Sequence, residues 1–243
     1  LSSQPQTPTI KKAVSPSSSA VHLRGPFQAV SVPGRRPLSE HFGTVVTITV
    51  GPQKKAFVIH KDVLCFCSDY FRAAFNGSFK EAIEGKLSLP DEDADLFYIV
   101  NGFVYTRQLR QEDRQTGPQL SHRTLGQLWA FGDRYLMPAL QNTAMDACIK
   151  RISLSNNGWF TGESMEREYG QTSEGSPLRR FLVDWQAHKS EQSKERLGQW
   201  PQEALVDLAT TLSSMKSEHR GINKLPDDRG KCYYHVHAEG EHC

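Results

Sequence analysis

Features that would indicate a membrane protein or an enzyme are missing from this sequence of 243 residues. No apolar run approaches the roughly 18 residues that a membrane-spanning helix requires. The first residues lack the continuous apolar core of a secretory signal. There is no P-loop, no G-x-G-x-x-G after a strand, no G-x-S-x-G and no H-E-x-x-H. We therefore expect a non-enzymatic intracellular protein, in the cytoplasm or the nucleus, that does not enter a membrane.

Charge and cysteine content exclude two further classes of protein. The net charge of +2 is too small to favour direct binding to nucleic acid. The five cysteines are an odd number, and three of them fall within apolar helical patterns. Because no export signal accompanies them, we expect reduced thiols rather than a disulfide framework.

Large apolar side chains are also scarce at the N-terminus. Residues 1–42 contain three consecutive serines and six prolines. A segment of this composition cannot bury enough apolar surface to offset its chain entropy. We therefore predict a disordered Ser/Pro-rich tail over residues 1–42.

The most informative pattern begins immediately after this tail. Val46, Ile48 and Val50 alternate with threonines, which is the period of two typical of a half-buried strand. A second strand ends at His60, and from there the apolar residues recur at three and four up to Phe75. We therefore predict a β-hairpin that leads directly into one helix, with His60 as a structural residue at the junction.

These residues resemble the BTB/POZ family. The family's hairpin ends in a V-H-K/R-x-V-L run, and an S-x-Y-F-R-A-x-F helix follows it. Here residues 59–64 read I-H-K-D-V-L, and residues 68–75 read S-D-Y-F-R-A-A-F. A third strand at 86–90 and helices that include 123–137, with Leu136 inward, and 139–153 complete the pattern. The resemblance implies an α+β fold, a small three-stranded sheet flanked by a cluster of helices, with a mostly helical extension after it.

The later part of the chain has a different character. Apolar positions after Pro177 and Pro201 align at helical spacing, which predicts two more helices. Residues 169–184 resemble the extension that follows the BTB domain in many fungal proteins. We therefore expect four segments: a disordered tail at 1–42, a BTB/POZ domain at 43–153, a helical extension at 154–229 and a Cys/His-rich tail at 230–243.

A three-residue motif carries the partner prediction. In BTB adaptors of ubiquitin ligases, a hydrophobic residue, any residue and a glutamate precede the third strand and contact the cullin-3 scaffold. Phe79-Lys80-Glu81 has this pattern at the matching place. An exposed aromatic ring would fill a pocket while the carboxylate fixes the register. In the alternative interpretation, Phe79 packs on its own domain and Glu81 is solvated.

Two other surfaces of the BTB family involve residues of the first strand and the first helix. Many members pair an aspartate at the start of the first strand with a basic residue after the histidine. Lys61 is that basic residue here, but Thr44 occupies the aspartate position, so Lys61 is either a partner contact or a surface cation. The apolar faces of the first strand and helix could instead form a self-complementary homodimer surface, although in a monomer they would be core. The candidate dimer residues are Val46, Ile48, Val63 and Leu64.

The C-terminal tail concentrates residue types that bind metals. Cys232-x-x-His235 is a usable zinc spacing, and in an extended segment His235 and His237 point to the same side. One structural zinc would anchor a tail that is too short to fold alone. The alternative is a solvated tail, or one whose histidines pack against its two tyrosines. The candidate ligands are Cys232, His235, His237 and Cys243.

The function that these features favour is protein–protein interaction. The specific form is a dimeric substrate adaptor for a cullin-RING ubiquitin ligase, with a cullin-3-type scaffold as partner. The alternative is a transcription-associated BTB scaffold. It would act only through partner proteins, because the chain has no zinc-finger array and no basic region.

Overall fold

The structure is a computed structural model that describes residues 42–111, 115–154, 160–188, 193–217, 229–238 and 240–243. All of them belong to one compact unit, residues 31–243. The predicted disorder of residues 1–42 falls almost entirely outside the described residues.

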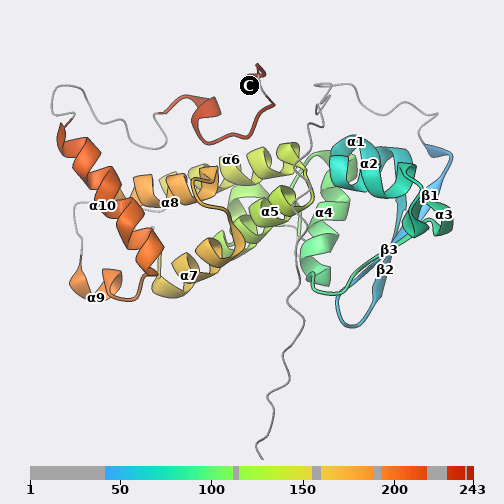
Figure 1. Ribbon diagram of the computed structural model, residues 1–243, viewed down its shortest axis with the longest axis horizontal. Helices are drawn as coiled ribbons and strands as arrows, with labels where there is room; N and C mark the ends of the chain where they lie inside the picture. The colour runs from blue at the N-terminus through green and yellow to red at the C-terminus, as the bar shows by residue number, and fades with distance from the viewer. Residues whose placement is uncertain (1–41, 112–114, 155–159, 189–192, 218–228, 239) are drawn as a thin grey trace, which may run out of the picture. The chain divides into compact units, whose positions relative to one another are not determined.

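A three-stranded sheet opens the described chain, in the order β2-β1-β3 (Figure 1). The sheet consists of β1 (Val45–Val50), β2 (Lys55–His60) and β3 (Lys86–Leu89). The first two strands pair antiparallel, with Val46 opposite Ile59 and Ile48 opposite Phe57, and all four side chains are buried. The third strand pairs parallel with the first. The period of two therefore places one apolar face against the helices, as predicted.

The apolar stripe after the hairpin belongs to two helices, α1 (Lys61–Cys67) and α2 (Asp69–Asn76). Ser68 between them is extended, with φ −149° and ψ 121°. Its hydroxyl accepts the N–H of Phe71 at 3.0 Å, which caps α2, and donates to the carbonyl of Tyr135 at 2.6 Å. The prediction of one continuous helix was therefore wrong, because a spacing of three and four survives a break of a single residue.

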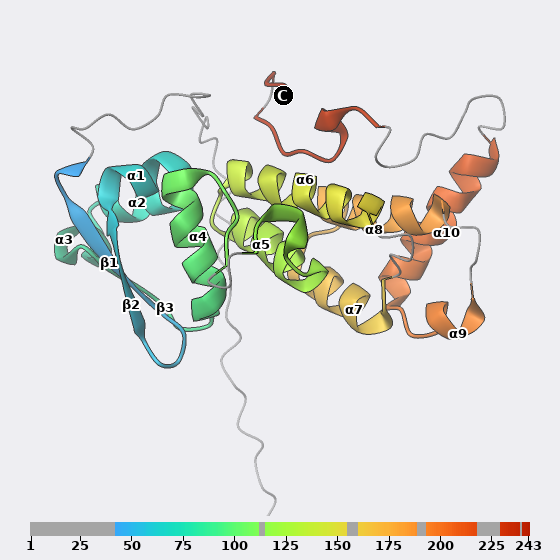
Figure 2. The same ribbon diagram turned by 180° about the vertical axis from the view of Figure 1, so that it is seen from behind.

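The acidic run before the fourth helix is explained by capping and pairing. The helix α3 (Lys80–Glu84) precedes β3, and α4 (Ala94–Thr106) follows it. The carboxylate of Asp93 accepts two backbone N–H groups at the start of α4, each at 2.8 Å. Glu92 pairs with Arg134 and accepts the hydroxyl of Tyr135 at 2.9 Å. Figure 2 shows α4 beside the sheet. The ring centres of Phe97 on α4 and Phe57 on β2 are 4.8 Å apart.

The helical pair α5 (His122–Arg134) and α6 (Pro138–Leu154) completes the first part of the fold, close to the predicted spans. The segment before it is less polar than the sequence suggested. Leu109 and Leu120 are buried, and a 3-10 turn lies at Gly117–Gln119. This connection therefore packs on the core, although the polar, turn-rich sequence of residues 107–122 predicts a surface loop.

The extension contains four helices within the described residues: α7 (Gly162–Gln171), α8 (Pro177–His188), α9 (Lys194–Leu197) and α10 (Gln202–Ser217). A 3-10 turn at Lys231–Tyr233 begins the C-terminal tail. Sequence analysis predicted α8 and α10 but missed α7 and α9. One hydrophobic cluster runs from the strands through α8 and α10 to Tyr234. The described extension therefore shares a core with the first part, and a separate domain at 154–229 stays a prediction.

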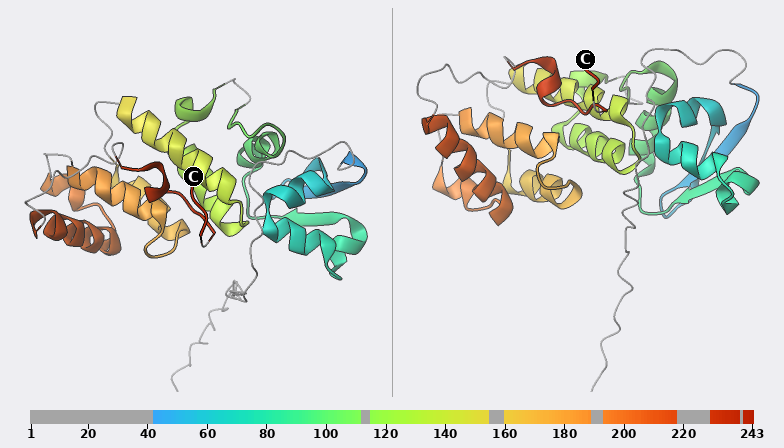
Figure 3. Two further views of the ribbon diagram at one scale, coloured as in Figure 1. Left: turned by 90° about the horizontal axis from the view of Figure 1, so that it is seen from above. Right: turned by 45° about the horizontal axis from the view of Figure 1, so that its top comes forward.

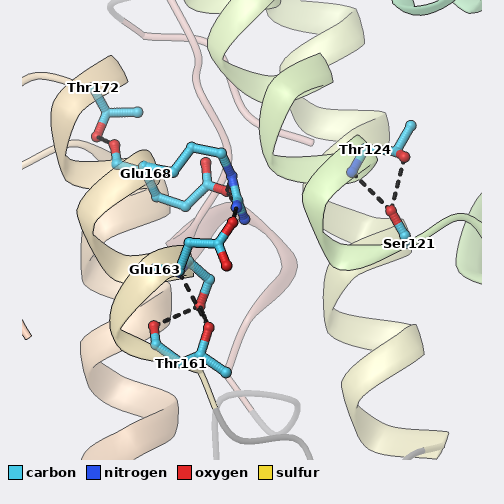
Figure 4. A network of polar contacts seen from close by, with 8 residues as sticks. Ser121, Thr124, Thr161, Glu163, Glu168 and Thr172 are labelled. Carbon is cyan, nitrogen blue, oxygen red and sulfur yellow. Dashed lines mark hydrogen bonds and ion pairs between the residues drawn. The ribbon is translucent and has the colours of Figure 1, made fainter. Parts of the chain in front are cut away.

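Close packing between α5 and α7 depends on one glycine. A Cβ on Gly126 would lie 2.5 Å from Oε1 of Glu168, so only glycine leaves room for this carboxylate. Figure 4 shows Glu168 on α7 with Thr161 at the start of that helix and Thr172 after its end. Thr161 caps α7 by accepting the N–H of Ser164 at 3.2 Å.

No helix within the described residues combines the length and the apolar character needed to cross a membrane.

Candidate functional site

Two apolar side chains of the α3 segment are directed to solvent. Phe79, the residue before α3, is 64% exposed, and Ile83 is 82% exposed. The N–H of Ile83 donates to the carbonyl of Phe79 at 3.3 Å, so the two residues are one helical turn apart. The interpretation in which Phe79 packs on its own domain does not agree with this exposure.

The exposed apolar surface continues onto α2. Tyr70 is half-exposed, and its ring lies 5.0 Å from that of Tyr135. Burial and the negative charge of Glu81 raise the pKa of Tyr70, so the carboxylate of the motif lies near this ring. The backbone N–H of Asp69 reaches the carbonyl of Leu136 at 3.4 Å. We name this set the α3 surface: Tyr70, Phe79, Glu81, Ile83 and Leu136.

Leu136 is held exposed at a conformational cost. The sequence pattern predicted Leu136 in the core, but its side chain is 54% exposed and its backbone has φ 50°, in the left-handed region. It follows the end of α5, where the N–H of Met137 returns to the carbonyl of Gly132 at 2.7 Å. Glycine is the usual residue at this position, and any other residue costs about 1 kcal/mol or more there. Leu136 therefore carries a conformational cost that glycine would avoid, while its side chain stays exposed.

The charged pocket of the family is incomplete here. Lys61 begins α1, and its backbone N–H donates to the carbonyl of Thr44 at 2.9 Å, so these two positions are neighbours. A threonine hydroxyl supplies no negative charge to pair with the lysine. The role of Lys61 as a partner contact stays a prediction.

The four candidate dimer residues are core residues of this chain. Val46, Ile48, Val63 and Leu64 are each 2% exposed or less. Their apolar surface is already used within one chain, so they offer none to a second copy in this conformation. Val45, next to Val46, and Phe66, two residues after Leu64, are exposed. Dimerisation through this region stays a prediction.

The C-terminal tail brings its cysteines and histidines together. The ligand atoms of Cys232, His237 and Cys243 lie within 4.8 Å of one another. The Sγ of Cys243 is 3.3 Å from Nε2 of His237 and 3.1 Å from Nδ1 of His235. The backbone N–H of Cys243 approaches Sγ of Cys232 at 3.1 Å. His235 is outside this group of three, although its Nδ1 lies close to Cys243. Thiolate and imidazole donors are the types that bind structural zinc.

Comparison with known proteins identifies the first part of the chain. The family model described as BTB/POZ domain matches residues 38–152. Residues 38–152 are a BTB/POZ domain. The α+β fold class is thereby confirmed, and the domain is a protein-interaction module. A helical extension follows the BTB domain, as the sequence predicted.

The relatives are much longer proteins. The chain is 23% identical over 141 residues to Kelch-like protein 40 of Xenopus tropicalis, covering 58% of this chain and 21% of the relative. It is 25% identical over 109 residues to Kelch-like protein 21 of Danio rerio, covering 45% and 16%. With BTB/POZ domain-containing protein 9 of Homo sapiens the identity is 25% over 143 residues, covering 56% and 22%. The chain therefore spans about a fifth of each relative, and the resemblance to fungal proteins stays a prediction.

The thiols of the BTB domain differ from those of the tail. Burial raises the pKa of Cys65 to about 11 and that of Cys148 to about 12, against a usual 9.0. A rise of this size lowers the thiolate fraction of Cys65 about a hundredfold. After chelator treatment, we expect iodoacetamide to modify Cys232 and Cys243 at least tenfold faster than Cys65 and Cys148, as measured by peptide mass spectrometry. Equal rates across the four would contradict the burial.

Four residues of these sites were not identified from the sequence: Tyr70, Ile83, Leu136 and Asp146. Tyr70 lay on the predicted helical stripe, and Leu136 lay on a predicted core face. Asp146, on α6, reaches Nε2 of His235 from 89 positions away along the chain. A break in the helix and a long-range contact leave no mark on periodicity, so no local signal could have found them.

Proposed function

We propose that the BTB domain docks a cullin-3-type scaffold of a ubiquitin ligase through the α3 surface and so acts as a substrate adaptor. The observation that supports this most directly is the exposure of Phe79 and Ile83 on either side of Glu81. The resemblance supports the same assignment, because Phe79-Lys80-Glu81 precedes the third strand as the cullin-contacting motif of BTB adaptors does. The partner that supplies the substrate would bind elsewhere on the chain.

The energetics of such an interface are favourable. Each of the two apolar side chains would gain about 1.5–3 kcal/mol if it were fully buried by a partner. Glu81 between them adds a charge that selects partners and fixes orientation. The backbone of Leu136 is fixed in a left-handed turn. It therefore presents a third apolar side chain without a further loss of backbone conformational freedom.

Replacing Phe79 and Glu81 together with alanine should weaken binding to a purified cullin-3 N-terminal domain by about a hundredfold. Both side chains are outside the hydrophobic core, so the melting temperature should stay within a few degrees of the wild-type value. Isothermal titration calorimetry and thermal unfolding of the same samples measure the two effects.

Matched controls separate the surface from general effects. Ile83→Ala should weaken binding by about tenfold. Val206→Ala, an exposed apolar truncation on α10, should leave binding unchanged. Leu136→Gly removes an apolar side chain from the α3 surface, so it should weaken binding. Because glycine also relieves the left-handed strain, the free energy of unfolding should stay within about 1 kcal/mol of the wild-type value. Wild-type affinity in the Phe79→Ala, Glu81→Ala variant would refute the proposal.

We also propose that the tail holds one structural zinc ion per chain through Cys232, His235, His237 and Cys243. The donor set supports this proposal, since two thiolates and two imidazoles complete a tetrahedral shell. When bound, the ion would supply cross-links that a short tail cannot obtain from a core of its own.

A further inference from the structure

The C-terminal segment connects two separate helices of the fold. We name residues 229–238 and 240–243 the C-terminal strap. Figure 3 shows the end of the chain beside α6 and α8. The first of these helices belongs to the BTB domain and the second to the extension. The strap contacts each of the two helices through specific hydrogen bonds.

On α6, the strap is held by two side chains one turn apart. Asn142 forms a pair of hydrogen bonds with the backbone of Val236: its Nδ2 donates to the carbonyl at 2.9 Å, and its Oδ1 accepts the N–H at 2.7 Å. Asp146, four residues later on the same face, places Oδ1 2.8 Å from Nε2 of His235. Residues 235 and 236 are therefore fixed to the BTB domain.

On α8, the strap is held by one carboxylate. The hydroxyl of Tyr234 donates to Oδ2 of Asp184 at 2.8 Å, and Nη2 of Arg229 lies 3.6 Å from the same oxygen. The ring of Tyr234 also meets that of Phe181 at 5.4 Å, and Tyr234 is fully buried. Consecutive residues of the strap thus face different helices.

The contact with Asp146 determines which nitrogen of His235 faces the cysteines. Because Nε2 meets the carboxylate, Nδ1 is the atom that remains for a metal, and it lies 3.1 Å from Sγ of Cys243. A histidine that binds a metal usually gives its other ring N–H to a carboxylate or a carbonyl, which fixes the ring and makes it a better ligand. His235 is buried, so its ring is held in this orientation.

The spacing of the donors agrees with a tetrahedral ion. Zinc bonds of about 2.0–2.3 Å place neighbouring ligand atoms about 3.3–3.8 Å apart in a tetrahedron. The distance from Cys243 Sγ to Nε2 of His237, 3.3 Å, is at the short end of this range, and the distance to Nδ1 of His235, 3.1 Å, is just below it. Small adjustments of the tail would therefore accommodate the ion.

On this basis, and resting on the structural zinc proposed above, we infer that the zinc site fastens the BTB domain to its extension. Asp146 of the BTB domain acts as a positioning residue that orients His235 toward the ion. The ion orders the strap, and the ordered strap joins α6 to α8 through Asn142 and Asp184. Loss of the ion would release the strap from both helices together.

Zinc content, zinc affinity and hydrogen exchange of the full chain test this inference. We expect one zinc per chain by metal analysis of wild type and almost none in Cys232→Ser. Removing zinc with a chelator should increase amide hydrogen exchange in residues 229–238 and at neighbouring sites in α8, and adding zinc should restore protection. Asp146→Asn should bind zinc ten- to hundredfold more weakly in competition with a chelating dye. Its stoichiometry at saturation and its metal-free melting temperature should be unchanged.

Asp91→Asn, the same change at an exposed site away from the strap, is the matched control and should retain wild-type affinity. Asn142→Ala should loosen the strap while keeping one zinc per chain. Wild-type zinc affinity in Asp146→Asn would refute the positioning role. If zinc is bound but its removal leaves amide hydrogen exchange unchanged, the fastening role is refuted and the proposal of a structural zinc is kept. Absence of zinc in wild type, including a Cys232–Cys243 disulfide in its place, would overturn the zinc proposal and this inference with it.

Discussion

Replacing Arg179 with alanine should lower the free energy of unfolding by about 3–5 kcal/mol and disorder the helical extension. The guanidinium is buried, and Nη2 donates to the carbonyls of Tyr169 at 2.6 Å and Thr172 at 2.5 Å. Its Nε donates to the hydroxyl of Thr172 at 3.1 Å. It also lies 4.3 Å from the ring centre of Tyr169. One side chain therefore joins α8 to the end of α7.

The size of this effect follows from what the truncation would leave behind. The last carbonyls of a helix have no partner within the helix, and a cation there is also favoured by the helix dipole. Arg179 is buried and supplies both a hydrogen-bond donor and a positive charge at the C-terminal end of α7. Alanine would leave two carbonyls and a hydroxyl without their donor in a site that water reaches poorly, together with the volume of the missing side chain.

Urea unfolding followed by circular dichroism would measure the loss. Glu203→Ala is the matched control, because Oε2 of Glu203 accepts from Nη1 of Arg179 at 2.9 Å but its side chain is 73% exposed. An exposed pair of this kind contributes at most about 1 kcal/mol. If Arg179→Ala cost no more than Glu203→Ala, the carbonyl contacts would not be the source of the stability.

The BTB part of the fold could be predicted from the sequence because its signals are local. Alternation of apolar residues gave β1, and a histidine at the hairpin's end marked the start of α1. Asp93 reads as a cap and caps α4. The break at Ser68 was missed although serine is a common N-cap, because its second contact, with the carbonyl of Tyr135, is 67 positions away.

The extension was harder to predict because charged residues occupy its interior. Glu168 and Arg179 are buried, whereas a sequence pattern assigns such residues to solvent. Arg179 bonds to α7 and α10, and Glu168 packs against Gly126 of α5, so neither the burial nor α7 shows in the local period. The candidate metal site is intermediate: spacing brought its four proposed ligands to notice, but Asp146 enters only through the tertiary fold.

Glu168→Gln should stabilise the chain by about 3 kcal/mol above pH 7 and have no effect below pH 4.5. Burial raises the pKa of Glu168 from 4.5 to about 7, although Arg167 opposes the rise. The guanidinium of Arg167 donates to Oε1 at 3.1 and 3.2 Å, while Oε2 is buried without a hydrogen-bond partner among the described residues. The charged form is therefore poorly accommodated beside Gly126, and the neutral form is tolerated.

The sign of the pH effect follows from proton binding. Between pH 4.5 and about 7 the folded chain keeps a proton on Glu168 that the unfolded chain has released, so the stability of wild type falls as the pH rises through this window. Glutamine does not titrate in this range. The free energy of unfolding of Glu168→Gln, plotted against pH, should therefore lack this fall. Glu163→Gln, on the same helix and 83% exposed, is the matched control and should run parallel to wild type (Figure 4). Urea unfolding at pH 4, 5.5, 7 and 8 would measure the curves. A Glu168→Gln curve that also ran parallel to wild type would show that the buried carboxyl keeps an ordinary pKa.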